Sequence, residues 1–461
     1  MAQATSAAAK KEKSPVSFAS RTGRLVGFLN TPTGQRAAVL AVLLLGLLVR
    51  LWMVADWNSY RPDSPARLIG DEPGYDNLAR EFLAGYGFTW PGRVPFYPIW
   101  LAAVYLLTNG SYAQALYWQI IPGLLTILLT YLLGRRLLGH AVGVLAALGA
   151  AVSYTLVHQT VHYLSEIWFT PLLLAVLLAL NAALARPSWK RFIFAGFLLG
   201  ISNLVRPTLL FFPFFALPLL RVKLSSRKWL GWGAVYIAAG LLTVTPWLVH
   251  NYLRYDVWFP LQTSNAILWQ GSPEYYRLIH DEGYTYLQIW TEVLYGPGWE
   301  GRDPNSVSGD RYWTERALQS IRAEPYIYLL YAVEKTGTFW VGDPNADWNN
   351  TYIFNVRALR DTGFTRVGAV SVMLMRALPL LAVWAIWRLR RQWRRLLPLY
   401  TLLLFATLLH AATHAEARLS EPFQPLLLVL IAGALWPLIQ IATRRLYTAR
   451  RSTAVGSGAD Q

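Results

Sequence analysis

The chain has 461 residues, of which 54% are hydrophobic and only 15% charged, and this composition excludes an ordinary soluble globular protein. A net charge of +17 often indicates nucleic-acid binding, but here the basic residues fall between apolar runs, so we expect no nucleic-acid partner. The absence of cysteine excludes disulfide bonds and thiolate metal sites. We therefore predict an all-α, polytopic membrane protein.

The N-terminal part contains a polar tail and a first apolar run. Residues 1–36 are basic and lack the apolar core and cleavage site of a signal peptide, so we expect a cytoplasmic tail. Residues 37–55 are long enough to cross about 30 Å of hydrocarbon as a helix. Arg50 lies near the outer end of this run. We expect its side chain to reach the membrane interface, and the alternative is that it faces a lipid phosphate inside the protein.

The next segment, residues 56–111, is more than a simple connector. Asp71 and Glu72 precede a proline, and apolar residues follow at helical spacing, which is typical of a helix start. A second apolar run, 95–107, is too short to span the membrane comfortably. We expect two short helices along the outer surface, joined by residues 85–95.

Apolar runs continue along the chain, with one long interruption at 251–365. They predict an N-terminal membrane domain, 37–250, and C-terminal membrane helices, 366–443, followed by a second cytoplasmic tail, 444–461. The total is ten spans if the two short runs beside Arg206 are counted separately. After the first span, the runs are 112–133, 141–158, 165–184, 191–205, 207–220, 229–250, 366–387, 396–414 and 422–443.

The distribution of basic residues predicts the orientation of these spans. More than half of the Lys and Arg residues lie in the tails and in four short connectors, where the only acids are Glu12 and Asp460. Such segments stay in the cytoplasm, so we expect both termini inside and residues 56–111 and 251–365 outside. The second of these segments is rich in aromatic residues and turn sequences, and we expect a small external domain there.

Two adjacent carboxylates just outside the first span are the main candidates for catalysis. In the simpler interpretation, Asp71 or Glu72 only caps a helix. In the functional interpretation, the pair lies in the catalytic loop of a membrane enzyme, where a carboxylate accepts a proton from the substrate. We assign Asp71 as the base and Glu72 as a neighbour that orients it or binds substrate hydroxyls, although the pattern also permits the reverse.

Arginines at the predicted outer boundary are candidates for binding the phosphate of a lipid substrate, because a guanidinium group matches phosphate oxygens and stays charged. Arg93 and Arg206 are expected to bind this phosphate, with headgroup anchoring as the alternative. Arg418 is a third candidate, with a structural ion pair to Glu416 as its alternative. The other candidates for substrate binding are Tyr75, Tyr97, His162, Glu166 and Glu416.

Two pairs of histidines have a spacing that can bind zinc on a helix. They are His158 with His162 and His410 with His414. Neither pair lies in an HExxH pattern, and interfacial histidines are usually just hydrogen-bonded, so we expect no required cofactor. A divalent metal ion is nevertheless compatible with the sequence. No glycine-rich phosphate loop precedes a helix in the cytoplasmic connectors, which argues against a nucleotide-driven enzyme.

Several short motifs follow one another in an order that is typical of one family. They are Gly70-Asp71-Glu72 with Tyr75, Arg93 through Pro98, Leu204 through Thr208, Thr245-Pro246-Trp247 with His250-Asn251-Tyr252, and Glu416 through Ser420 with Pro422 and Pro425. Through them, residues 37–443 resemble the bacterial lipid-carrier-dependent glycosyltransferases of the GT-C superfamily, relatives of protein O-mannosyltransferases and of the lipid A aminoarabinose transferase. The sequence departs from the pattern at His250, where relatives tend to have arginine.

The resemblance implies a GT-C-like fold with the catalytic acid in the first external loop. It implies a hexosyl- or pentosyltransferase of the bacterial inner membrane that uses a polyprenyl-phosphate-linked sugar, and we expect inversion with Asp71 as the base. The acceptor would be a lipid, glycan or protein, and membrane lipids would be further partners. The alternatives are a lipid-linked glycan ligase or polymerase, and a lipid or sugar transporter. A transporter is disfavoured because the sequence shows no internal repeat.

Overall fold

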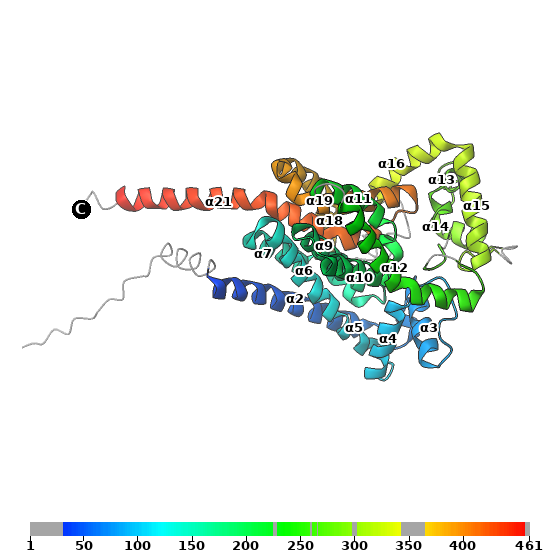
Figure 1. Cartoon of the computed structure of the whole chain (residues 1–461). Coiled ribbons are helices and arrows are strands. Elements are labelled where there is room, and N and C mark those ends of the chain that lie inside the picture. Colours follow the sequence, from blue (N-terminus) through cyan, green and yellow to red (C-terminus); the bar gives the residue numbers. More distant parts are fainter. Residues whose placement is uncertain are drawn as a thin grey trace, which may run out of the picture. The chain divides into compact units, whose positions relative to one another are not determined.

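The computed structural model describes residues 31–224, 228–258, 261–264, 266–296, 302–342 and 365–456. Every regular element in these ranges is a helix, which confirms the predicted all-α class (Figure 1). The chain divides into two units, residues 42–436 and the two chain ends, and the larger unit holds all the sites described below.

The first half of the described chain consists of helices joined by short turns. They are α2 (Pro32–Tyr60), α3 (Glu72–Leu83), α4 (Phe96–Leu107), α5 (Tyr112–Trp118), α6 (Ile120–Leu138), α7 (His140–Val152), α8 (Tyr154–His158), α9 (Glu166–Ala185), α10 (Trp189–Val205), α11 (Phe212–Lys223) and α12 (Lys228–Tyr255). Helices α6, α9, α10 and α12 each pack against the next in this order, and α7 packs on α6. They form the middle of the larger unit.

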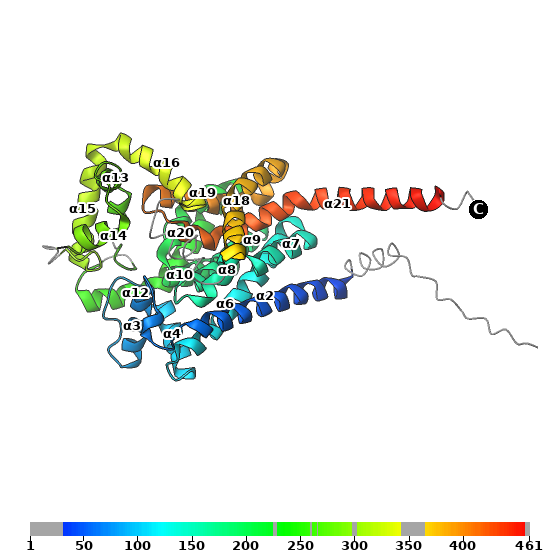
Figure 2. The same cartoon turned by 180° about the vertical axis from the view of Figure 1, so that it is seen from behind.

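The second half begins with short helices and returns to long ones. They are α13 (Pro273–His280), α14 (Tyr286–Gln288), a π-helix (Ile289–Leu294), α15 (Val307–Ala323), α16 (Pro325–Val341), α18 (Thr365–Arg388), α19 (Trp393–Ala412), α20 (Ala417–Ser420) and α21 (Gln424–Gly456). Helices α13, α14 and α15 gather at the same end of the larger unit as α3 (Figures 1 and 2). This end carries the pocket described below.

The chain is a multi-pass membrane protein. Within the described ranges, six helical stretches are long and apolar enough to cross a membrane, and the bent pair of α7 and α8 makes up to seven. Helices also form over the other expected spans, as α10, α11 and α18, but they are not among these. Helix α11 has 12 residues, which gives a length of only about 18 Å at 1.5 Å per residue. The predicted count of ten spans is therefore not confirmed.

The two short helices predicted after the first span are confirmed as α3 and α4, which pack against each other. A buried carboxylate, Asp76, joins them to α5. It accepts hydrogen bonds from the hydroxyls of Tyr105 (2.6 Å) and Tyr112 (3.0 Å), and it pairs with Arg80 Nε at 3.0 Å. Because each oxygen of this buried carboxylate has partners, the cluster fixes the segment that leads into the pocket.

Arg50 does not reach the membrane interface, so the expected position of its side chain is wrong. The residue is fully buried, and its Nη1 donates to the carbonyls of Gly46 and Ala151 at 3.3 Å each. Nη2 donates to the Leu156 carbonyl at 3.4 Å. A Cβ atom at Gly123 would come within 2.5 Å of Arg50 Nε, so this glycine makes room for the guanidinium group. Arg50 therefore connects α2 to α7 and α8, and it lies outside the pocket described below.

Helices α13 to α16 share an aromatic core that includes Trp269, Tyr275, Trp313 and Tyr331. Lys335 on α16 is buried, and its Nζ donates to the carbonyls of Gly271 and Thr413 at 2.9 Å each. The second bond reaches the turn after α19, so this segment is fixed to the C-terminal helices. Its location outside the membrane stays a prediction, and residues 343–364 of the expected external domain lie outside the described ranges.

Candidate active site

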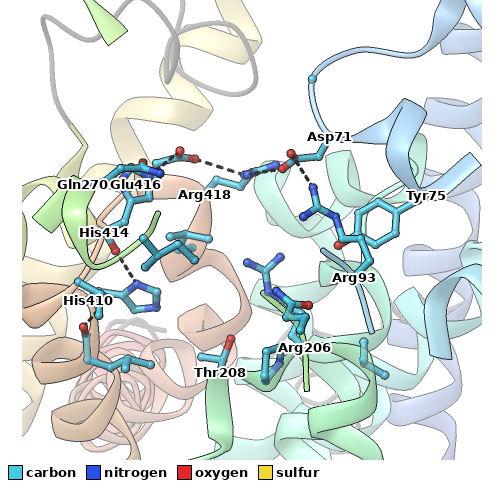
Figure 3. A pocket seen from close by; sticks show the side chains of 18 of the residues that line it. Asp71, Tyr75, Arg93, Arg206, Thr208, Gln270, His410, His414, Glu416 and Arg418 are labelled. Atoms are coloured by element: carbon cyan, nitrogen blue, oxygen red, sulfur yellow. Dashed lines mark hydrogen bonds and ion pairs between the residues drawn. The ribbon is translucent and has the colours of Figure 1, made fainter. Parts of the chain in front are cut away.

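A pocket of about 470 Å³ lies where four parts of the chain meet (Figure 3). These parts are the start of α3 with the segment before α4, the turn after α10, the stretch from Gln262 to Trp290, and the end of α19 with its connection to α20. The polar side chains that line it are Asp71, Tyr75, Arg93, Arg206, Thr208, Gln262, Gln270, His410, Thr413, His414, Glu416 and Arg418. Residues far apart in sequence therefore share one cavity.

The pocket brings together many, but not all, of the residues that the sequence analysis predicts as site residues. Those that line it are Asp71, Tyr75, Arg93, Arg206, Glu416 and Arg418. Four others lie behind its wall, namely Glu72, Tyr97, His162 and Glu166. The functional roles of both groups stay predictions.

Asp71 reaches the pocket because of the turn that starts α3. Gly70 has a positive φ of 56°, a conformation that glycine adopts without steric cost. Asp71 follows at the N-cap position, but its side chain makes no capping hydrogen bond. The helix-cap interpretation is therefore wrong for Asp71, whose carboxylate faces the pocket.

Two arginines clamp the Asp71 carboxylate, one on each oxygen. Arg93 Nη2 donates to Oδ1 and Arg418 Nη2 donates to Oδ2, both at 2.9 Å. The Arg93 guanidinium also lies 5.1 Å from the centre of the Tyr75 ring and 4.9 Å from that of Trp90. Cations are attracted to aromatic faces at these distances, so the rings hold the guanidinium group in place.

The arginines also determine the protonation state of Asp71. Partial removal from water would raise the pKa of the Asp71 carboxyl, but the positive charges of Arg93 and Arg418 outweigh this effect. The pKa of Asp71 is therefore held well below its ordinary value. The side chain is 35% exposed, so the ionised carboxylate is accessible from the pocket.

Arg206 enters the pocket because of the residue that follows it. A proline at the next position disfavours the helical conformation, and Arg206 is extended (φ −152°, ψ 128°) where α10 ends. Its Nη1 pairs with Glu166 Oε1 at 2.7 Å, and Arg418 Nε lies 3.7 Å from the same oxygen. Glu166 is thus a buried counter-charge behind the two arginines.

The opposite side of the pocket carries a histidine and a carboxylate. Glu416 Oε1 lies 2.8 Å from His414 Nε2, and Glu416 Oε2 lies 3.5 Å from Arg418 Nε. Burial would raise the pKa of Glu416, but Arg418 and His414 lower it below its ordinary value. The ion pair of Arg418 with Glu416 is therefore present, in addition to the pair with Asp71. Figure 3 shows Arg418 between the two carboxylates.

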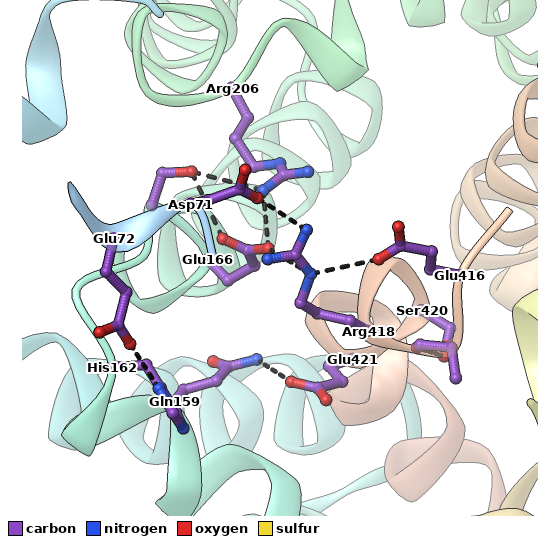
Figure 4. Close-up of polar contacts among 12 residues, drawn as sticks. Asp71, Glu72, Gln159, His162, Glu166, Arg206, Glu416, Arg418, Ser420 and Glu421 are labelled. Atoms are coloured by element: carbon purple, nitrogen blue, oxygen red, sulfur yellow. Dashed lines mark hydrogen bonds and ion pairs between the residues drawn. The ribbon is translucent and has the colours of Figure 1, made fainter. Parts of the chain in front are cut away.

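Glu72 points away from this cluster (Figure 4). Its Oε1 lies 2.5 Å from His162 Nδ1, and Oε2 accepts a hydrogen bond from the Ile69 backbone nitrogen at 3.1 Å. The Glu72 side chain is only 3% exposed. Tyr97 is also buried, with its hydroxyl on Gln119 Oε1 at 3.0 Å. These residues support the wall of the pocket.

The residues present do not fit a divalent metal ion. In the described ranges, no three His, Cys, Asp or Glu side chains lie close enough together to hold one. Both oxygens of Asp71 are occupied by arginines, and the nearest other pocket carboxylate, Glu416, pairs with His414 and Arg418. The rings of His158 and His162 lie edge to face at 4.5 Å without a third ligand.

Several pocket residues were not nominated as site residues. Gln262 comes from an irregular segment before α13, Gln270 from a short 3-10 helix (Trp269–Gly271), and Trp290 from the π-helix. No periodicity or motif marks such residues. His410 and His414, which the sequence suggests only as a zinc-binding pair, also line the pocket, and the position of His414 two residues before Glu416 is a further local signal for its place there.

A second cavity, an apolar groove of about 530 Å³, lies beside the pocket. It is lined by α10, α11 and α12, with Leu210 and Phe211 following closely after the pocket residue Thr208. The other lining residues are Leu199, Asn203, Pro213, Phe214, Ile237, Gly240, Leu241, Val244, Leu248, Trp258 and Leu261. The groove offers an apolar surface next to the polar pocket.

Residues 93–250 match the family model described as dolichyl-phosphate-mannose-protein mannosyltransferase. The matched segment begins at the pocket residue Arg93 and includes Arg206. No curated protein is similar enough to count as a match.

Solved structures have a similar arrangement of helices. The apo oligosaccharyltransferase of Archaeoglobus fulgidus is 18% identical, with a TM-score of 0.53 over 92% of this chain and 52% of that chain. The same protein with zinc and sulfate is 16% identical, with a TM-score of 0.52 over 90% and 51%. ArnT from Cupriavidus metallidurans, bound to undecaprenyl phosphate, is 16% identical over 88% of this chain and 78% of that chain, with a lower TM-score of 0.42. The chain spans about half the length of the archaeal protein.

Proposed function

We propose that the chain is an integral membrane glycosyltransferase of the GT-C superfamily, on the basis of the fold that it shares with the archaeal oligosaccharyltransferase and of the family-model match over residues 93–250. It transfers a hexosyl or pentosyl group from a polyprenyl phosphate carrier to an acceptor lipid, glycan or protein. The observation that carries the proposal is the Asp71 carboxylate held between two arginines in a pocket that contains a third. A base and an anion site are thereby combined in one cavity.

The reaction requires both parts of this cluster. An acceptor oxygen or nitrogen attacks the anomeric carbon of the sugar, and the bond from that carbon to the phosphate oxygen breaks with its electron pair going to the phosphate. Asp71 accepts the acceptor proton, and arginine stabilises the charge that develops on the phosphate. With the base and the leaving phosphate on opposite sides of the anomeric carbon, a single displacement inverts its configuration.

The apolar groove supports a lipid-linked donor rather than a soluble one. It follows the pocket directly along the chain, from Thr208 to Leu210, and isoprenoid units need only apolar contact. A phosphate at Arg206 would therefore have its lipid chain beside α10 to α12.

The direct test is a donor assay. Purified full chain is incubated with a polyprenyl-phosphate-linked monosaccharide and a lipid extract, and products are followed by mass spectrometry. We expect free polyprenyl phosphate together with a glycosylated acceptor. Transfer of an intact oligosaccharide would favour a glycan ligase, and unmodified donor moved across a vesicle membrane would favour a transporter.

Sidedness provides a second test, because a polyprenyl-linked donor must meet the site outside the cytoplasm. The chain has no native cysteine, so Ser64→Cys and Ser306→Cys can be labelled specifically. Both should react with an impermeant maleimide in intact cells, whereas Ser188→Cys, in a basic connector, should react only after permeabilisation. The reverse pattern would contradict the extracytoplasmic site.

A further inference from the structure

The Asp71 carboxylate occupies two of the guanidinium groups that a donor phosphate would need. Arg93 and Arg418 each give one Nη2 hydrogen bond to it, whereas Arg206 is paired with Glu166 and makes no hydrogen bond to Asp71 among the contacts described. A carboxylate and a phosphate are both anions that bind the same face of a guanidinium group. The base and the substrate therefore compete for the same donors.

Each of the two arginines is anchored in a way that leaves its Nη2 end exchangeable. Arg93 Nη1 donates to the Gly92 carbonyl at 3.0 Å, and the guanidinium group lies 4.9 Å from the ring centre of Trp90 and 5.1 Å from that of Tyr75. Its anchor is thus independent of Asp71.

Arg418 has a corresponding anchor at its Nε end, which faces Glu416 at 3.5 Å and Glu166 at 3.7 Å. The loss of Asp71 as a partner would leave both guanidinium groups positioned, Arg93 by the Gly92 carbonyl and two aromatic rings and Arg418 by its remaining pairs with Glu416 and Glu166. Figure 4 shows the carboxylates around Arg418.

Resting on the proposed function, we propose that Arg93 and Arg418 are exchange arginines, which hold Asp71 in the empty pocket and pass to the donor phosphate during the reaction. The charges balance. A polyprenyl-phosphate-linked sugar is a phosphodiester with one negative charge, and its product is a monoester with two. Over the same step Asp71 gains the acceptor proton and loses its charge, so the arginines follow the negative charge from the carboxylate to the phosphate.

Exchange also explains how a carboxylate clamped in this way becomes a useful base. Two bound cations lower the pKa of Asp71, and a carboxylate with a low pKa is a weak proton acceptor. When the donor phosphate binds one or both Nη2 groups in place of Asp71, the carboxylate loses that stabilisation. Partial burial then raises the pKa of Asp71. Proton acceptance is thereby favoured after the donor is bound.

The test is a double-mutant cycle on phosphate binding. Radiolabelled undecaprenyl phosphate is titrated against the purified full chain in phosphatidylcholine nanodiscs. Asp71→Asn removes the competing anion, so the dissociation constant should fall by roughly 3- to 10-fold, as expected for a partly exposed ion pair. The same substitution should lower turnover by roughly 10²- to 10⁴-fold, which separates binding from catalysis.

The arginine backgrounds distinguish exchange from a general charge effect. The gain from Asp71→Asn should disappear when both Arg93→Gln and Arg418→Gln are present, and it should persist with Arg206→Gln, the matched control in the same pocket. If the Gln variants fail to fold, Arg93→Lys and Arg418→Lys replace them and should reduce the gain.

An equal gain in every background, or unchanged or weaker binding in Asp71→Asn, would overturn the exchange and leave the donor assignment intact. Wild-type protein that binds no undecaprenyl phosphate while also failing the donor assay would overturn the proposed function itself, and the exchange with it.

Discussion

Asp71 and Glu72 are adjacent carboxylates with opposite surroundings. The Asp71 side chain is 35% exposed to a pocket and bonded to two arginines, whereas the Glu72 side chain is 3% exposed and bonded to His162 and a backbone nitrogen. Successive residues at a helix start point about 100° apart, so one carboxylate faces the cavity and the next faces the packed interior. The same chemical group is therefore a candidate base in one case and a structural contact in the other.

The largest expected effect is the loss of turnover when Asp71 is replaced, which tests the difference in role between Asp71 and Glu72. Asp71→Asn keeps the shape and removes the proton acceptor, so kcat should fall by roughly 10²- to 10⁴-fold. Steady-state transfer from a polyprenyl-linked sugar measures it, with the thermal midpoint as a control for folding. A loss of less than tenfold would contradict Asp71 as the base, and a larger loss in Glu72→Gln would mean that the roles of the two carboxylates are reversed.

Glu72 should instead affect stability. Glu72→Ala removes two hydrogen bonds to a buried charged group and should lower the free energy of unfolding by about 1–3 kcal/mol. Thermal unfolding in detergent measures the change, and Glu315→Ala, at an exposed position on α15, is the control. Glu72→Gln keeps an acceptor oxygen and should be milder. Unchanged stability with a large loss of kcat would contradict a structural role.

The sequence predicted the local parts of the site and not its long-range geometry. The helix start at Asp71 and the break after Arg206 follow from proline positions, and both are present. The meeting of Arg418 with Asp71 joins residues 347 positions apart, which no local pattern encodes. Whether Asp71 or Glu72 faces the pocket depends on the residue at which the helix starts. The periodicity of the sequence does not determine that start to within one residue.

The position expected for Arg50 is wrong, and the count of ten spans is not confirmed. A basic residue near the end of an apolar run normally reaches the interface, but Gly46 and Gly123 leave space for the guanidinium group between helices. Two short runs beside Arg206 were counted as full spans, although α11 is too short to cross on its own. Packing partners, which composition does not reveal, determine the position of Arg50, and the length of α11 limits the span count.

A smaller effect is expected from changing the shape of the cations around Asp71 while keeping their charge. Arg93→Lys and Arg206→Lys lose the two-pronged contact with phosphate, and KM for the donor should rise by about 5- to 10-fold. Donor titrations measure it, with Arg186→Lys in an exposed connector as the control. Unchanged KM in both pocket variants would favour headgroup anchoring.

The smallest expected effect is that of acid on the wild-type protein. A base must be ionised to act, and because the pKa of Asp71 is held below its ordinary value, lowering the pH from 7 to 5 should not protonate it in the free protein. The stability that its ion pairs contribute is present above the unfolded pKa of about 3.9 and is lost only as the pH falls through the still lower folded pKa. The profile of kcat/KM should therefore show no acid limb from Asp71 in this range.

In Arg418→Gln one of the stabilising cations is absent, so the pKa of Asp71 rises and an acid limb should move to higher pH. If the pH profiles of the two proteins coincide, Arg418 does not control the pKa of Asp71. The proposed electrostatic difference between Asp71 and Glu72 would then be contradicted.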